Sequence, residues 1–232
     1  HALKPRRFQT RVIAVMIAVV AAAQLATFAV VTVATQRAVS SRLEQELSVG
    51  HRVWEQFQQS RSEQLLASAS VLADDFGFRA AVASGDLPTL RSALDNHGTR
   101  IGADLAWLLD RDGRWQASAH GMAAPAPAVL AGIMQQAGRE GLALQTVVVK
   151  DALYLVVVLP VMAPEQVGWL AIGRRYDDTV AQQYRSLTGL EAAFVTTDGA
   201  GTRVHASTLP AEQRAMFANV WAPGGDHVHA LA

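Results

Sequence analysis

The sequence predicts an α+β protein in which a long N-terminal helical region precedes antiparallel sheet structure. Three observations carry this prediction. Residues 12–34 form an uncharged, largely apolar run, and residues 35–84 hold apolar side chains at helical spacing without a proline. From residue 103 onward the period changes, and short β-branched runs alternate with turn residues. Helices that precede and interrupt a set of hairpins are typical of an α+β fold.

The composition excludes several classes of protein. The chain has 232 residues, a formal net charge of zero and no cysteine. Disulfides, thiolate nucleophiles and cysteine-based zinc sites are therefore excluded. A nucleic-acid interface is not expected, because neutralising phosphates needs a surplus of Lys and Arg.

The apolar run at residues 12–34 predicts a transmembrane helix. At 1.5 Å per residue it is about 34 Å long, enough for a hydrocarbon core. It is too long for the apolar region of a signal peptide. The residues before it are basic: Lys4, Arg6, Arg7 and Arg11. The positive-inside rule then places residues 1–11 in the cytoplasm as a short stub and everything after residue 36 in the periplasm or outside the cell. The membrane is thus an expected partner.

Residues 35–85 predict one amphipathic stalk helix. Its apolar stripe is Val39, Leu43, Leu47, Trp54, Phe57, Leu65, Ala69, Leu72 and Phe76. The stripe can face a second copy near the membrane, which predicts a homodimer, and a sheet further out. Arg61 and Gln64 interrupt the seam, so a strict coiled coil is not expected.

Residues 86–187 predict a first sheet domain. Asp86 is placed to cap a helix at 87–102, and a hairpin is expected at 103–119. A Pro-flanked segment at 124–141 leads into a short helix, followed by strands at 144–162 and 166–176. This order fits a five-stranded antiparallel sheet with helices packed on one side.

Residues 188–232 predict the beginning of a second, incomplete sheet domain. A helix at 178–187, capped by Asp177 or Asp178, leads into it. A strand–turn–strand pattern at 189–208, a helix at 209–220 and the start of a further strand follow. So few strands do not make an independent sheet, so the native chain is expected to continue.

No catalytic or metal site is predicted, and no cofactor. Asp75-Phe76-Gly77 resembles a kinase triplet but lacks the other kinase motifs, so Phe76 and Phe78 are expected to be packing residues. Gly224-Gly225-Asp226 is interpreted as a turn. His205, His227 and His229 are too few for a convincing metal site and are interpreted as a solvated strand face.

The order of elements resembles the double Cache sensor regions of bacterial transmembrane receptors. Residues 72–113 and 188–214 are particularly similar to the third double-Cache subfamily. The resemblance implies PAS-like domains: a membrane-distal one at 86–187 with a small-molecule pocket and a membrane-proximal one at 188–232. It also implies a cytoplasmic output after a second membrane helix, often a diguanylate cyclase that makes cyclic di-GMP, sometimes with a phosphodiesterase. A histidine kinase or chemotaxis output is the alternative.

The candidate ligand-binding residues lie on the strands of the distal sheet. Aromatic side chains with a polar tip suit a small-molecule pocket, and an arginine can hold a carboxylate. The candidates are Trp107, Trp115, Tyr154, Trp169 and Arg174. The competing interpretation is that the tryptophans are core and the arginine is surface. Two other classes stay open: an anchored structural or partner-binding subunit, and an extracytoplasmic enzyme.

Overall fold

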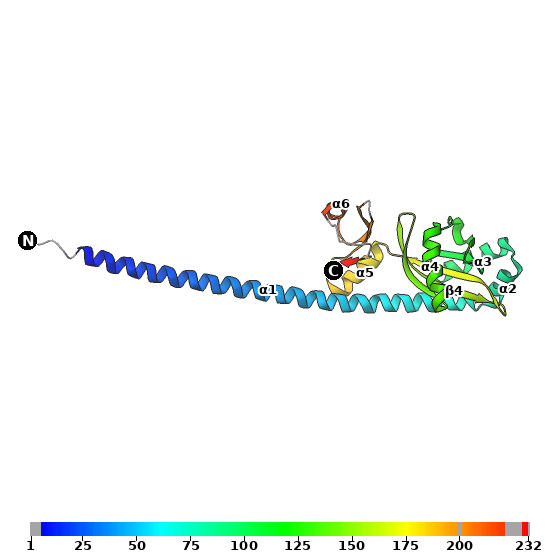
Figure 1. The fold of residues 1–232 in the computed structure, drawn as a ribbon, viewed down its shortest axis with the longest axis horizontal. Helices are drawn as coiled ribbons and strands as arrows, with labels where there is room; N and C mark the ends of the chain where they lie inside the picture. Colours follow the sequence, from blue (N-terminus) through cyan, green and yellow to red (C-terminus); the bar gives the residue numbers. More distant parts are fainter. Residues whose placement is uncertain (1–5, 199–200, 221–228, 232) are drawn as a thin grey trace, which may run out of the picture. The chain divides into compact units, whose positions relative to one another are not determined.

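The computed structural model describes residues 6–198, 201–220 and 229–231 (Figure 1). The chain divides into two compact units, His1–Val49 and Gly50–Ala232. Helix α1 (Arg6–Ala73) contributes residues to both. It contains no proline and a single glycine, Gly50, so nothing in its sequence interrupts the backbone hydrogen bonds of the helix.

The predicted membrane span at residues 12–34 is not confirmed. Most of its side chains lie outside the described residues. Within the part of the chain that the structure describes, no helix is both long and apolar enough to cross a bilayer.

The predicted stalk helix at 35–85 is two helices in the structure. Helix α1 ends at Ala73, and α2 (Phe76–Ser84) starts after Asp75. Asp75 caps α2, because its Oδ1 accepts a hydrogen bond from the backbone N–H of Phe78 at 2.7 Å. The capping aspartate thus gives the Asp-Phe-Gly triplet its structural role.

The two phenylalanines beside this cap have different environments. Phe78 is buried, as expected, but Phe76 is 80% exposed, so the expectation that it packs was wrong. The prediction assumed one continuous helix, in which Phe76 would extend the apolar stripe. Because the helix breaks before Phe76, the side chain of Phe76 points in a different direction. The stripe prediction holds for Leu65, Ala69 and Leu72, which are all buried.

The first sheet has five antiparallel strands in the order β2-β1-β5-β4-β3, which confirms the predicted five-stranded antiparallel sheet. Helix α3 (Leu87–Arg100) precedes it, and a short 3₁₀ turn, η1 (Ala119–Gly121), and α4 (Pro127–Glu140) lie between its second and third strands. The strands are β1 (Leu105–Leu109), β2 (Trp115–Ser118), β3 (Ala143–Val149), β4 (Ala152–Met162) and β5 (Gln166–Arg175).

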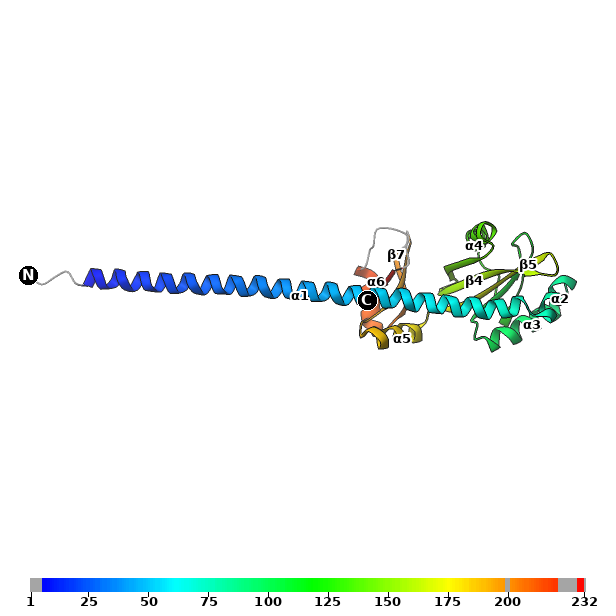
Figure 2. The same ribbon diagram turned by 90° about the horizontal axis from the view of Figure 1, so that it is seen from below.

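Helices cover both faces of this sheet, not one as predicted. The C-terminal part of α1 packs with α2 and α3 on one face, here named the α1 face, and α4 packs on the other, the α4 face. Figure 2 shows α4 and α1 on opposite sides of the strands. All five residues of β1 are buried, and residues 153–159 of β4 are buried without interruption. Strands that are apolar on both sides need cover on both sides, because exposed apolar surface is unfavourable in water.

The second sheet has three strands in the order β7-β6-β8. Its elements are α5 (Asp178–Thr188), β6 (Ala193–Asp198), β7 (Gly201–Ser207), α6 (Ala211–Val220) and β8 (His229–Leu231). Its core contains Trp54 of α1, whose ring centroid lies 5.5 Å from that of Tyr184 and 5.3 Å from that of Phe194. Helix α1 therefore packs against both sheets.

Candidate ligand-binding site

Four aromatic side chains gather on the α4 face of the first sheet. They come from four different strands: Trp107 of β1, Trp115 of β2, Tyr154 of β4 and Trp169 of β5. Trp107 is fully buried, Tyr154 is 8% exposed and Trp169 is 7% exposed. Successive side chains of a strand point to opposite faces, so the hydrogen-bonding register decides which aromatic residues meet.

The register brings the tryptophans together. Leu109 of β1 is the Cα partner of Trp115 on one side and of Trp169 on the other. Cross-strand partners point to the same face, so Leu109, Trp115 and Trp169 form a row across three strands. Trp107 lies two residues from Leu109 in β1 and points to the same face.

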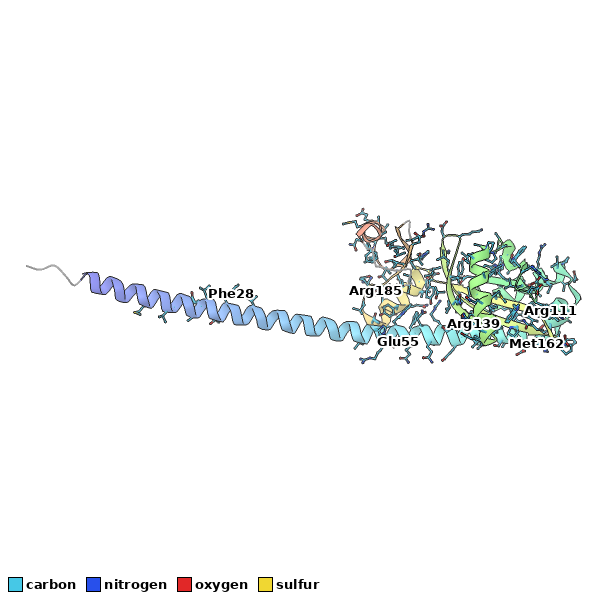
Figure 3. All side chains as sticks on the ribbon, in the orientation of Figure 1. Phe28, Glu55, Arg111, Arg139, Met162 and Arg185 are labelled. Carbon is cyan, nitrogen blue, oxygen red and sulfur yellow. The ribbon has the colours of Figure 1, made fainter. Side chains whose placement is uncertain are left out.

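Two of the three indole N–H groups are buried without an acceptor. Nε1 of Trp169 donates to the carbonyl oxygen of Arg111 at 3.3 Å, in the turn labelled by Arg111 in Figure 3. Among the described residues, Nε1 of Trp107 and Nε1 of Trp115 have no partner, and neither does the buried Oε1 of Gln136 on α4. Buried polar groups are normally hydrogen-bonded, so these three atoms are positions that a ligand or water can satisfy.

The buried part of the α4 face is uncharged, whereas Arg175, at the end of β5, is an exposed charge on the same face. The buried cluster under α4 is entirely hydrophobic, and the buried polar residues that the structure describes are Ser118 and Ser207. A charged ligand group placed there would lose its hydration without gaining a countercharge. The site therefore suits uncharged hydrogen-bond acceptors.

Arg174 does not join the aromatic residues. It is the Cα partner of Leu155, which packs on the α1 face, whereas Tyr154 is the partner of Arg175. The alternation along β5 puts Trp169 and Arg175 on one face and Arg174 on the other. The structure therefore does not bring Arg174 together with the other four candidates. The sequence already indicated this, because Arg174 is an odd number of residues from Trp169 in the same strand and so points to the opposite face.

Helix α4 approaches the β1–β2 turn closely. A Cβ atom on Gly113 would lie 2.7 Å from Cγ of Met134, and the φ of Gly113 is +79°. Both facts require a glycine there. Met134 and Gln136 are both residues of α4, and no sequence pattern indicated either, because residues 124–141 predict only a linker and a short helix.

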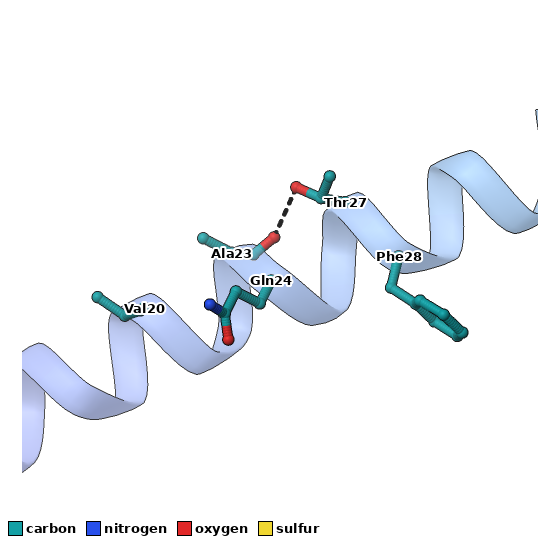
Figure 4. A pocket seen from close by; sticks show the side chains of 5 residues that line it. All are labelled: Val20, Ala23, Gln24, Thr27 and Phe28. Carbon is teal, nitrogen blue, oxygen red and sulfur yellow. Dashed lines mark hydrogen bonds between the residues drawn. The ribbon is translucent and has the colours of Figure 1, made fainter.

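Two surface hollows lie away from this site. One, of about 510 Å³, is formed by residues of α1 alone: Val20, Ala23, Gln24, Thr27 and Phe28 (Figure 4). The hydroxyl of Thr27 donates to the carbonyl oxygen of Ala23 at 2.9 Å, so its hydrogen bond is made within the helix. The second, of about 350 Å³, lies beside Phe76 and Met162. Neither contains the buried unpaired atoms found under α4.

A polar junction joins the β3–β4 turn to the second sheet. The side chain of Arg203 forms an ion pair with Asp151. The ring nitrogens of His205 lie 2.7 Å from Oγ1 of Thr196 and 3.2 Å from the carbonyl oxygen of Asp151. Burial lowers the pKa of His205 and outweighs the carbonyl of Asp151, which raises it. The neutral imidazole is therefore the form that fits this junction.

The structure offers no metal centre among the residues it describes. No group of three or more potential metal ligands occurs among them. His205 is occupied at the junction just described, His227 lies outside the described residues, and so do Gly224-Gly225-Asp226.

Comparison with known proteins identifies a sensory family. Residues 40–218 match the family model dCache_3, the double sensory domain of two-component sensor kinase. No curated protein matches the chain.

One solved structure of a sensor domain shares the fold, and two further sensor domains match with TM-scores below 0.5. The periplasmic domain of Vibrio cholerae LuxQ has a TM-score of 0.51 at 15% identity, covering 70% of this chain and 78% of LuxQ. The sensor domain of the V. cholerae histidine kinase DctB has a TM-score of 0.46 at 17% identity, covering 69% and 66%. The sensory domain of the Campylobacter jejuni chemoreceptor Tlp3 with isoleucine bound has 0.45 at 13%, covering 78% and 72%.

The match over residues 40–218 covers most of the chain, with all strands of the first sheet and β6 and β7 of the second. Domains of this type are non-catalytic sensory modules of receptors. The chain belongs to the double Cache family of extracytoplasmic sensory domains.

Proposed function

We propose that this chain is the ligand-sensing input region of a membrane-bound receptor and that its ligand binds on the α4 face. The observation that carries the proposal is the pair of buried indole N–H groups of Trp107 and Trp115 that lack acceptors. Both are on adjacent strands of one sheet face, beside Trp169 and Tyr154. Leaving a buried donor unsatisfied costs about 1–3 kcal/mol, which a ligand acceptor recovers.

The proposed ligand is small, largely apolar and uncharged, with carbonyl, ether or hydroxyl oxygens that accept from the two indoles. Its apolar part would pack on Trp169 and Tyr154, and a donor group would meet Oε1 of Gln136. The absence of a buried charged residue under α4, within the described chain, argues against a zwitterion.

The test is a thermal-shift screen of neutral carbonyl compounds, with isoleucine as the zwitterionic probe. Trp107→Phe keeps an aromatic ring but removes the N–H, and should weaken binding of a hit about tenfold, the equivalent of one lost hydrogen bond. Trp54→Phe, in the core of the second sheet, is the matched control and should leave the affinity unchanged. The proposed site would be refuted if the two variants bound the hit with equal affinity, or if isoleucine were the one compound that raised the melting temperature.

The proposed anchor is a transmembrane helix at residues 12–34, with residues 1–11 in the cytoplasm. Support comes from the described apolar side chains of α1: Val20 is 54% exposed, Leu25 70% and Phe28 72%. Wild-type chain should stay in the membrane pellet after alkaline carbonate extraction. Leu25→Lys, which introduces a charge into the span, should release a measurable fraction, whereas Gln59→Lys, which adds the same charge at an exposed position of α1 outside the span, should not.

The proposed homodimer forms through the apolar stripe of the stalk. Because the chain has no cysteine, single cysteines report contacts directly. Leu43→Cys and Leu47→Cys should form disulfide-linked dimers in membranes, and Gln45→Cys, about 160° from both around the helix axis, should not. Equal cross-linking at all three positions would contradict a stripe-mediated dimer.

The proposed output is a cytoplasmic diguanylate cyclase or phosphodiesterase, with a histidine kinase or chemotaxis receptor as the alternative. The family description names sensor kinases, which supports the alternative. The coding sequence beyond Ala232 decides between them. Should it encode neither kind of domain, the role of an anchored, partner-binding subunit takes first place.

A further inference from the structure

Two arginines on the α1 face, on the side of the sheet away from the aromatic site, are near enough for the charge of one to act on the other. Arg61 comes from α1 and Arg174 from the end of β5; they are here called the arginine pair. The guanidinium carbon of Arg61 lies 5.6 Å from the ring centroid of Phe57 and 5.7 Å from that of Tyr176. The two aromatic rings hold Arg61 in place while leaving its hydrogen-bond donors available.

The arginine pair has no anionic partner within the described residues. Neither side chain has an ion pair or a hydrogen bond there, although other arginines form five ion pairs with carboxylates. Nε of Arg61 is buried and unpaired. Arg guanidinium groups with buried donors are normally paired, because burial removes the water that would satisfy them.

The nearest carboxylates are used elsewhere. Oδ2 of Asp104 accepts from the backbone N–H of Arg175 at 2.8 Å, and Oδ1 of Asp177 caps α5 through the N–H of Val180 at 3.1 Å. The Tyr176 hydroxyl donates to Gln58. Burial lowers the pKa of Arg61, and Arg174 lowers it further, despite opposing effects of Tyr176, Asp177 and Asp104. Asp104 and Asp177 keep their charge, but neither carboxylate is hydrogen-bonded to Arg61, so its buried Nε still lacks an acceptor.

We infer that the arginine pair binds a small oxyanion, a carboxylate or a phosphate, between α1 and the end of β5. A guanidinium presents its N–H groups as a planar fork that matches the two oxygens of such an anion. Two forks from two different elements make the site more than a single surface arginine. It is separate from the site under α4, and its ligand has the opposite character.

The anion would connect the stalk helix to the sheet. Arg61 belongs to α1, and Arg174 is the last residue but one of β5, near the connection from the first sheet to α5. Filling the site removes the repulsion between the two cations and adds contacts that both elements share. The bound state should therefore hold α1 more firmly against the sheet than the free state does.

The experiment measures the melting temperature of the purified full chain at pH 7.5 in sodium phosphate, sodium succinate and sodium chloride of equal ionic strength. At a hundredfold excess over Kd, one bound anion should raise the melting temperature by about 5–10 °C above the chloride value. Phosphate giving the larger rise identifies a phosphate site, and succinate giving the larger rise identifies a carboxylate site.

Two variants and a matched control locate the effect. Arg174→Gln should abolish the rise, and Arg61→Lys, which keeps the charge and most of the stem but loses the fork, should reduce the affinity at least tenfold. Arg91→Gln, at an exposed position of α3, should leave the rise unchanged. The inference is overturned if neither salt exceeds chloride, or if the rise persists in both Arg174→Gln and Arg61→Lys. Trp107→Phe should not affect it, which separates this site from the proposed one under α4.

Discussion

The two faces of the first sheet are made from the same strands but are completed in different ways. On the α1 face, Leu72, Leu90 and Leu108 are fully buried and carry no polar atom that needs a partner. On the α4 face, Trp107 and Trp115 bring hydrogen-bond donors into an apolar cluster and find no acceptor. The difference indicates a division of roles: the leucine core of the α1 face fixes the fold, whereas the aromatic cluster of the α4 face, like the arginine pair elsewhere on the α1 face, keeps unused hydrogen-bond donors for a ligand.

The largest expected effect breaks the α1 face. Leu72→Ala should lower the free energy of unfolding by about 2–5 kcal/mol, because it leaves a cavity between α1 and the sheet. Val71, next to it in sequence, is 72% exposed, so Val71→Ala should change stability by about 0.5 kcal/mol or less. Chemical denaturation of both variants measures the difference. Similar losses in the two would mean that α1 does not pack on the sheet through Leu72.

A smaller effect should follow from wedging α4 away from its sheet. Gly113→Ala places a methyl group against Met134 and forces a side chain into a left-handed backbone conformation, which should cost about 1–3 kcal/mol. Gly141 has a φ of +78° but nothing near its missing Cβ, so Gly141→Ala should cost about 1 kcal/mol from the backbone alone. Denaturation midpoints compare them. If Gly141→Ala is the more damaging, α4 does not sit tightly on the β1–β2 turn.

The third prediction sharpens the contrast in hydrogen bonding within the α4 face. Both Trp107→Phe and Trp169→Phe remove volume, but only Trp169 loses an existing bond, to the carbonyl of Arg111. Without ligand, Trp107→Phe should therefore be less destabilising by about 1 kcal/mol. Unfolding free energies of the ligand-free variants test this. The opposite order would mean that the indole of Trp107 is satisfied in solution.

The smallest expected effect concerns pH at the junction between the sheets. The pKa of His205 is lowered from its ordinary value of 6.5 chiefly by burial. Below that pH the unfolded chain binds a proton that the folded chain resists, so stability is full above about pH 6.5 and declines as the pH falls through it. Melting temperatures from pH 7.5 to 5.0 should fall less steeply in His205→Gln than in wild type. Parallel profiles would show that His205 does not contribute.

The sequence predicted the five-stranded sheet because turn residues such as Asp112-Gly113 separate apolar runs of the length of a strand. It did not predict the break at Asp75, because a capping aspartate in a continuous apolar stripe looks like any polar helix residue until its side chain is seen to bond to Phe78. Helix boundaries depend on such single contacts.

For the site, residue type identified the aromatic candidates, but only the register assigned them to a face. The register places four candidates on the α4 face: Trp107, Trp115, Tyr154 and Trp169. It places Arg174 on the α1 face. The role proposed for Arg61 could not be predicted from the sequence for a related reason. In the sequence Arg61 only interrupts an apolar stripe, and Tyr176, whose ring it contacts, is 115 positions away.

Helix α1 also determines the order in which the protein can assemble. The hydroxyl of Tyr184 donates to the carbonyl of Gly50 at 3.0 Å, across a separation of 134 positions, and the whole first sheet lies between these two residues in the chain. The second sheet is thus completed by residues that the ribosome makes long before its own strands. Local pairing is fast and distant closure slow, so the first sheet should form early and bring the ends of this long loop together. A chain whose synthesis stopped after β5 would lack Tyr184 and Phe194, so Trp54 would have neither of these aromatic neighbours.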